Sequence, residues 1–148
     1  MNATDTSPLI GIVIATHGDL ARALIRSAEM IVGAQDNVVT LCLDQKDNLE
    51  TFHAALDTAA DQAEHGAGVL VLIDLFGGTP GNAASLSVHP RKLHVVSGVN
   101  LPMLLEVLLS RNAMSPEALA AHALESGRAG IIDIAARVRE QDGAARGP

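Results

Sequence analysis

The chain has 148 residues, 48% apolar and 18% charged, with a formal net charge of −7, two phenylalanines and no tryptophan or tyrosine. This length favours one domain with an aliphatic core. The acidic balance argues against binding to nucleic-acid phosphates or an anionic membrane surface, and the scarcity of aromatic rings argues against stacking on single-stranded nucleic acid.

The single cysteine, Cys42, lies in an apolar, strand-like run and excludes an intramolecular disulfide. We expect a buried, inert thiol in a reducing compartment. Residues 1–8 are polar, without a basic segment followed by an apolar one, and we expect them to be flexible. No run approaches the ~18 apolar residues of a membrane span. A cytoplasmic protein without direct membrane insertion is therefore expected.

Short apolar runs predict strands at residues 9–16, 38–43, 69–73 and 92–97, and a fifth strand-like piece at 130–134. Helices are predicted between them, and a proline at the first helical position marks the start of several. Thr79 is the predicted N-cap of the helix that begins near Pro80, and His89-Pro90 is predicted to end it. The first helix, residues 20–32, is predicted to bury one apolar face, made of Leu20, Ala23, Leu24, Ser27, Met30 and Ile31.

Strands that alternate with helices predict an α/β fold: an open, doubly wound, mostly parallel sheet with helices on both faces. We expect a single domain over residues 9–135 and a C-terminal tail over 136–148. The fifth strand follows a long helical stretch. It is expected to pair at an edge of the sheet or to cross to another subunit.

Three loops are predicted at the carboxyl edge of the sheet, where open α/β folds bind their ligands: residues 16–19, 74–82 and 97–100. For the first two loops to meet, the first and third strands must lie side by side. His17 and Asp74 then become the most informative pair. A carboxylate that binds one imidazole nitrogen fixes the tautomer and leaves the other nitrogen free as a nucleophile.

Gly77-Gly78-Thr79, with the helix behind it, offers main-chain N–H groups to an anion. A histidine, a carboxylate and an anion site together indicate phosphoryl transfer to histidine. Each residue also has a simpler interpretation: His17 as a polar loop residue, Asp74 as a turn cap and Gly-Gly-Thr-Pro as an ordinary turn.

Other chemistries find little support in the sequence. Neither a phosphate-binding P-loop nor a dinucleotide-binding glycine motif occurs, and there is no serine nucleophile elbow. The other histidines lack the spacing of metal ligands. We therefore expect neither a metal nor a cofactor.

Four motifs in order resemble one known family. They are the stretch from Ile12 to Gly18, the segment Ser27-Ala28-Glu29-Met30 with Gly33, the loop from Asp74 to Ala84, and the segment from Ser97 to Leu104. Over residues 9–135 the chain resembles the IIA domain of the mannose family of the bacterial phosphoenolpyruvate-dependent sugar phosphotransferase system.

The resemblance implies a phosphotransferase that carries its phosphoryl group on His17, with Asp74 orienting the ring. It implies HPr as donor, a IIB protein or domain as acceptor, and a homodimer that exchanges its last strand. Gly77, Gly78 and Thr79 are then expected to hold the phosphoryl oxygens. Thr16, Gly18, Phe76 and Asn100 are expected to line the site.

Two positions depart from the pattern of sugar transporters. Gly81 stands where a bulky residue is frequent, and Phe76 replaces a frequent tryptophan. Because both are expected beside the site, they leave open a stand-alone regulatory IIA protein that transports no sugar. A phosphotransferase subunit of dihydroxyacetone kinase is a further alternative.

Overall fold

The structure is a computed structural model and describes residues 8–145. Within them the chain alternates strands and helices as far as β4. The strands are β1 (Gly11–His17), β2 (Val38–Leu43), β3 (Val69–Ile73) and β4 (His94–Ser97). The helices are α1 (Leu20–Val32), α2 (Leu49–Ala63), α3 (Thr79–Arg91), α4 (Leu101–Ser110), α5 (Pro116–Ala129) and α6 (Ile134–Ala145).

The four strands of the described residues form one parallel sheet in the order β2-β1-β3-β4. This order confirms that the first and third strands lie side by side, with Ala15 opposite Ile73. The ends of β1 and β3 therefore meet at the carboxyl edge of the sheet, which brings the loops after them together.

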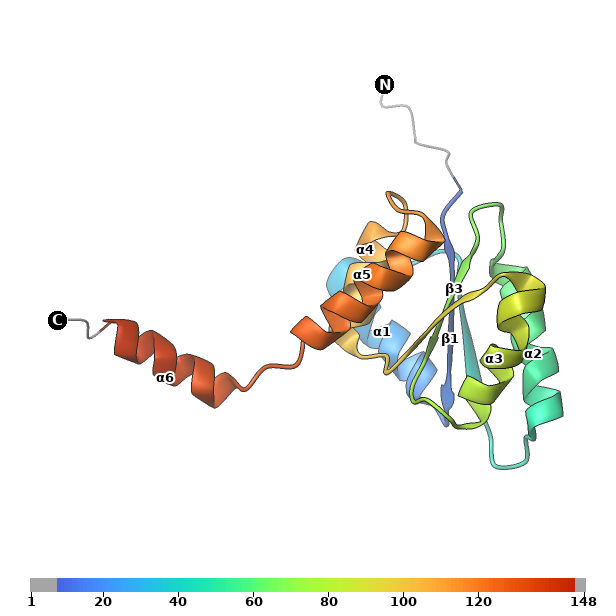
Figure 1. The fold of residues 1–148 in the computed structure, drawn as a ribbon, viewed down its shortest axis with the longest axis horizontal. Helices are drawn as coiled ribbons and strands as arrows, with labels where there is room; N and C mark the ends of the chain where they lie inside the picture. The colour runs from blue at the N-terminus through green and yellow to red at the C-terminus, as the bar shows by residue number, and fades with distance from the viewer. Residues whose placement is uncertain (1–7, 146–148) are drawn as a thin grey trace, which may run out of the picture.

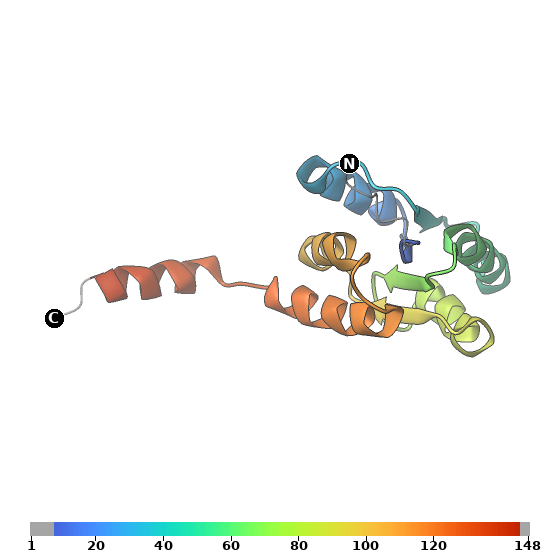
Figure 2. The same ribbon diagram turned by 90° about the horizontal axis from the view of Figure 1, so that it is seen from above.

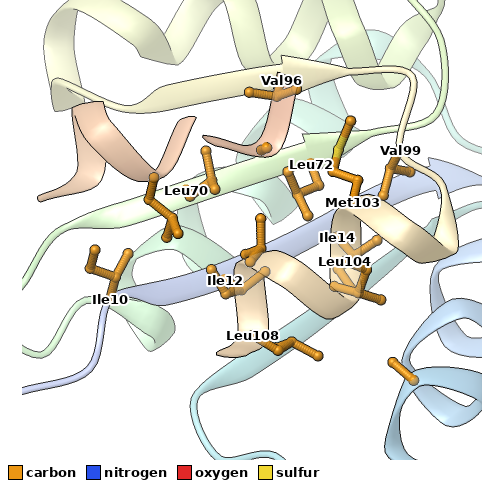
Figure 3. Packing of buried hydrophobic residues seen from close by; sticks show 14 of the residues in the cluster. Ile10, Ile12, Ile14, Leu70, Leu72, Val96, Val99, Met103, Leu104 and Leu108 are labelled. Atoms are coloured by element: carbon orange, nitrogen blue, oxygen red, sulfur yellow. The ribbon is translucent and has the colours of Figure 1, made fainter. Parts of the chain in front are cut away.

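Helices cover both faces of the sheet, as the α/β prediction required (Figures 1 and 2). Side chains alternate along each strand, so Ile12 and Ile14 of β1 pack on one face while Val13 and Ala15 pack on the other. The first face is covered by α1, α4 and α5, and Figure 3 shows Leu104 and Leu108 of α4 over it. The second face is covered by α2 and α3.

The predicted buried face of α1 is wrong except at Leu24, which is partly buried against the core. Ala21 and Ala28 are the buried residues of this helix, whereas Met30 and Ile31 are 89% and 61% exposed. Arg22, Arg26 and Glu29 form a polar stripe along α1, and the apolar side opposite them is wider than the contact with the sheet, so spacing alone does not identify which apolar residues are buried. The sheet selects the face that carries small alanines, which allow the helix to pack closely.

Helix α3 also departs from the prediction at both ends. Its N-cap is Gly78, and Thr79 is its first residue. Pro90 lies inside the last turn and does not end the helix, which closes when the main-chain N–H groups of Lys92 and Leu93 both donate to the carbonyl of Val88. Proline removes one donor, but the neighbouring hydrogen bonds hold this turn together.

The predicted fifth strand is absent from the described part of this chain. After α5 the backbone leads away from the sheet, and residues 131–133 have no regular structure (Figure 1). Because a strand needs a neighbour with which to pair, this segment cannot form one alone. The side chain of Asp133 accepts a hydrogen bond from the N–H of Ala136 at 3.0 Å, and this N-cap starts α6 at Ile134.

The predictions for the two chain ends fall partly outside the described residues. Residues 1–7 and 146–148 are not described, so their expected flexibility stays a prediction. Most of the predicted tail is helix α6, none of whose residues is buried in the described chain. None of the helices between residues 8 and 145 has the length and apolar character needed to cross a membrane.

Candidate active site

His17 and Asp74 are in direct contact. His17 is the last residue of β1, and Asp74 follows the last residue of the neighbouring β3. The Nδ1 atom of His17 lies 2.9 Å from the Oδ2 atom of Asp74, and the main-chain N–H of His17 donates to the same oxygen at 3.0 Å. The backbone and the side chain of one residue are thus both held by one carboxylate, which fixes the orientation of the ring.

Asp74 carries a negative charge at neutral pH. Burial raises the pKa of Asp74, but hydrogen bonds from the main chain and ring of His17 and from the N–H of Leu75 outweigh burial, so the net pKa lies below its usual value. An ionised carboxylate accepts hydrogen bonds and does not donate them. The Nδ1 atom of His17 therefore carries the proton of the neutral ring, and Nε2 carries the lone pair.

The Nε2 edge of the ring lies against Gly78. A β-carbon placed on Gly78 would be 2.6 Å from Cε1 and 3.0 Å from Nε2 of His17, so the ring occupies the space that a side chain would need. Gly78 is the N-cap of α3, where the first N–H groups of a helix lack intrahelical partners and the helix dipole is positive. Gly77 has a φ of +92°, which turns the loop into this helix. An anion bound at Nε2 would lie close to the start of α3.

Thr16 and Gly18 hold the loop that carries His17. The hydroxyl of Thr16 is buried and accepts a hydrogen bond from the N–H of Ala21 at 2.8 Å, which joins the start of α1 to the end of β1. The N–H of Gly18 donates to the carbonyl of Leu43 at the end of β2. Thr16 is therefore buried beneath the loop that carries His17, whereas Gly18 is exposed.

Phe76 and Asn100 lie in different surroundings. The ring of Phe76 is 85% exposed on the loop after Asp74. The side chain of Asn100 caps α4 through the N–H of Met103 and donates to the carbonyl of Gly127 on α5, both at 2.9 Å. Asn100 thus joins two helices, and neither of these hydrogen bonds reaches His17.

A hollow of about 630 Å³ opens beside His17 on the side of β2. Sequence reasoning did not select most of its lining. The sequence did contain a signal for this lining, because β2 ends next to β1 and the first turn of α1 follows His17 directly. The hollow is lined by His17, Gly18, Asp19, Arg22, Cys42, Leu43, Asp44 and Gln45.

Cys42 differs from its prediction. It lines this hollow and is half-buried, where a buried thiol was expected. It pairs with Thr16 in the sheet, one residue before the end of β1. Strand β2 is the edge strand on this side of the described sheet, so its end is less covered than those of β1 and β3.

Among residues 8–145, no group of three His, Cys, Asp or Glu side chains is placed to hold a metal ion. The chemistry that the site offers is that of an imidazole whose orientation is fixed. Its Nδ1 atom is oriented by a carboxylate, and its Nε2 atom faces the start of a helix.

Comparison with known proteins identifies relatives of one kind. The family model described as "PTS system fructose IIA component" matches residues 11–124, where PTS denotes the phosphotransferase system. The chain is 39% identical over 134 residues to the mannose-specific EIIAB component of Escherichia coli K12, a match that covers 89% of this chain and 42% of that protein. It thus spans less than half the length of this relative.

Two further relatives are closer to this chain in length. The fructose-specific EIIA component of Bacillus subtilis is 37% identical over 112 residues, covering 72% of this chain and 74% of the relative. The crystal structure of an EIIA component from Streptococcus agalactiae superposes with a TM-score of 0.78 at 33% identity, covering 86% of this chain and 99% of that one.

Proposed function

Since this chain belongs to the family of phosphotransferase-system IIA components of the mannose and fructose type, we propose that it is a phosphohistidine carrier. It accepts a phosphoryl group from HPr on His17 and passes the group to a IIB protein. The observation that carries the proposal is the contact between Nδ1 of His17 and the carboxylate of Asp74. That contact directs Nε2 away from Asp74 and, in the neutral ring, places the proton on Nδ1.

The phosphoryl transfer needs no proton to enter or leave. The lone pair of Nε2 attacks the phosphorus of the donor's phosphohistidine, and a new N–P bond forms while the donor's N–P bond breaks. The donor nitrogen leaves with the electron pair of the broken bond. His17 keeps its Nδ1 proton, and Asp74 stabilises the positive charge that the ring acquires.

The phosphoryl oxygens bind at the start of α3 in this proposal. Gly77, Gly78 and Thr79 form the turn next to the Nε2 edge, and the main-chain N–H groups of a helix start suit an anion. The hydroxyl of Thr79 supplies a further donor. Phe76, 85% exposed, and Leu75, 50% exposed, lie on the same loop and offer apolar contacts to a docking protein.

The proposal extends to the domain, its location and its assembly. Residues 9–135 form a single cytoplasmic IIA domain, and the family match over residues 11–124 supports this division. Two chains form a homodimer in which the segment after α5 crosses to the other subunit. The exposed Ile131 and Ile134 of this segment support such an exchange.

Phosphorylation with purified components tests the carrier function. The chain is incubated with enzyme I, HPr and labelled phosphoenolpyruvate, and we expect an acid-labile label. The label should be absent from His17→Ala, and Asp74→Asn should take it up at least about tenfold more slowly because the ring loses its orientation. Undiminished labelling of His17→Ala would overturn the proposal.

A control variant tests whether the label depends on His17 in particular. His65→Ala replaces another histidine, in the loop after α2, and should take up label like the unsubstituted chain. Adding a IIB protein should then discharge the label. A phosphorylated chain that transfers to none of the IIB proteins of its host would instead favour the regulatory alternative.

A further inference from the structure

Phosphorylation of His17 adds negative charge beside several carboxylates. A phosphoryl group brings about two negative charges to Nε2 of His17. Asp74 already contacts the other ring nitrogen at 2.9 Å, and Asp19 and Asp44 both line the adjoining hollow. Like charges at such short range destabilise one another unless a cation intervenes.

Arg22 is placed to neutralise this charge. It lies in the first turn of α1 and is one of the residues that line the hollow beside His17. The bond between Thr16 Oγ1 and the N–H of Ala21 ties this part of α1 to β1, so Arg22 is anchored to the strand that presents His17.

The present partner of Arg22 holds it weakly. Nη1 of Arg22 lies 2.8 Å from Oδ1 of Asp19, but the two side chains are 65% and 85% exposed. Exposed pairs of this kind contribute little to stability because water and salt screen them. A phosphoryl group, with its higher charge and three oxygens, is a stronger partner for the planar guanidinium.

We propose that Arg22 exchanges Asp19 for the phosphoryl group when His17 is phosphorylated, and thereby sets how far the phosphoryl equilibrium favours this chain. Asp19 holds the guanidinium beside the hollow in the unphosphorylated state. The inference rests on the proposed carrier function and adds to it a cationic phosphoryl-binding side chain, since the Gly77-Gly78-Thr79 turn offers only neutral donors.

The equilibrium of phosphoryl transfer from phosphorylated HPr is the first measurement. Arg22→Gln should lower the equilibrium constant for phosphorylation of His17 by about tenfold, because a charge-assisted contact is lost. Arg22→Lys should lower it less, since the charge remains without the fork of donors. Asp19→Asn should raise it, because a competing and repelling carboxylate is removed.

Arg26→Gln is the matched control. Arg26 is one turn further along α1, where it lines a different surface groove. Its replacement removes the same charge from the same helix and should leave the equilibrium constant unchanged. Because Arg22 and Arg26 are both exposed, neither variant should lose the fold.

The NMR signal of the Arg22 side chain gives a readout without any partner protein. In the isolated phosphorylated chain, the Nε–H resonance of Arg22 should shift relative to the unphosphorylated chain, and that of Arg26 should not. Equal equilibrium constants for Arg22→Gln and Arg26→Gln, or an unmoved Arg22 resonance, would overturn the role of Arg22. A chain that takes up no phosphoryl group at all overturns the carrier function as well, so the two failures are distinguishable.

Discussion

The position of the His17 ring is set by two neighbours that act on opposite edges. Asp74 binds the Nδ1 edge, and Gly78 leaves room for the Nε2 edge. The absence of a side chain at Gly78 is therefore part of the site. Its backbone angles, φ −81° and ψ 178°, are open to any residue, so the requirement for glycine comes from contact with the ring and not from backbone strain.

This distinction predicts the effect of Gly78→Ala. The new β-carbon would lie 2.6 Å from Cε1 of His17, so the ring or the loop must move and the contact with Asp74 must lengthen. We expect the rate of phosphorylation by HPr to fall about tenfold or more, because small displacements in a reacting pair cost that much. The free energy of unfolding should change by about 1 kcal/mol, as for an ordinary substitution.

Rapid-quench labelling and urea unfolding measure the two quantities. Gly143→Ala is the control, since a β-carbon on this residue of α6 would have no atom within 4 Å. A Gly78→Ala variant with the phosphorylation rate of the unsubstituted chain would show that the ring tolerates displacement.

The sequence predicted the contact between His17 and Asp74 but not the surroundings of the pair. His17 and Asp74 could be paired because both end apolar runs, and parallel strands bring their ends to one edge. The roles of Thr16 and Asn100 could not be read in the same way. Each side chain binds a main-chain group of the following helix, at 2.8 and 2.9 Å, and such caps depend on local backbone angles that residue types do not specify.

Among the elements, a buried arginine at the end of α4 binds main-chain carbonyls at the amino ends of the strands, opposite the site. Arg111, at the end of α4, is 3% exposed. Burial lowers the pKa of Arg111, while the nearby carboxylate of Asp36 acts in the opposite direction. Its guanidinium compensates for burial with hydrogen bonds to the carbonyls of Ile10, Asp36 and Asn37 and to the side chain of Gln35.

We expect Arg111→Gln to destabilise the fold by about 2–4 kcal/mol, because carbonyl groups in and beside the core lose their donors. The rate of phosphorylation of folded protein should not change, since the site lies at the other end of the strands. Urea unfolding and labelling below the unfolding transition test both statements. Arg128→Gln, exposed on α5, is the control, and equal stability of the two variants would contradict the structural role of Arg111.

The elements themselves show where pattern reasoning succeeds. Strands β2 and β3 have the predicted bounds because each is an apolar run with turn residues on both sides. In α2 the buried residues Phe52 and Leu56 follow the helical spacing, and charged and polar residues occupy the other side. In α1 the apolar side is wider than the contact with the sheet, and packing decides which part of it is buried.

In the whole molecule, the contacts within one chain do not account for the structure of the segment after α5. Residues 131–145, the C-terminal arm, extend away from the sheet in both views (Figures 1 and 2). The arm exposes large apolar side chains, and β4 leaves one edge of the described sheet unpaired. The sequence pattern predicted a strand at 130–134, which the described chain does not contain. No strand among the described residues pairs with this segment, and a strand needs such a neighbour. The exposed residues are Ile131, Ile132, Ile134 and Val138.

We therefore expect the arm to hold a dimer together. The full chain should sediment as a dimer at micromolar concentration, and a chain ending at Gly130 should sediment as a monomer that keeps its fold, because no arm residue is buried in the single chain. The double substitution Ile132→Asp with Ile134→Asp should also give a monomer, since charges would enter an apolar contact at a cost of several kcal/mol.

Met30→Asp is the control: Met30 is 89% exposed on α1, so its replacement adds charge to a different apolar surface and should leave the dimer intact. Analytical ultracentrifugation measures the mass and circular dichroism the fold. A monomeric full chain, or a dimer that survives loss of the arm, would refute the exchange of this segment between subunits.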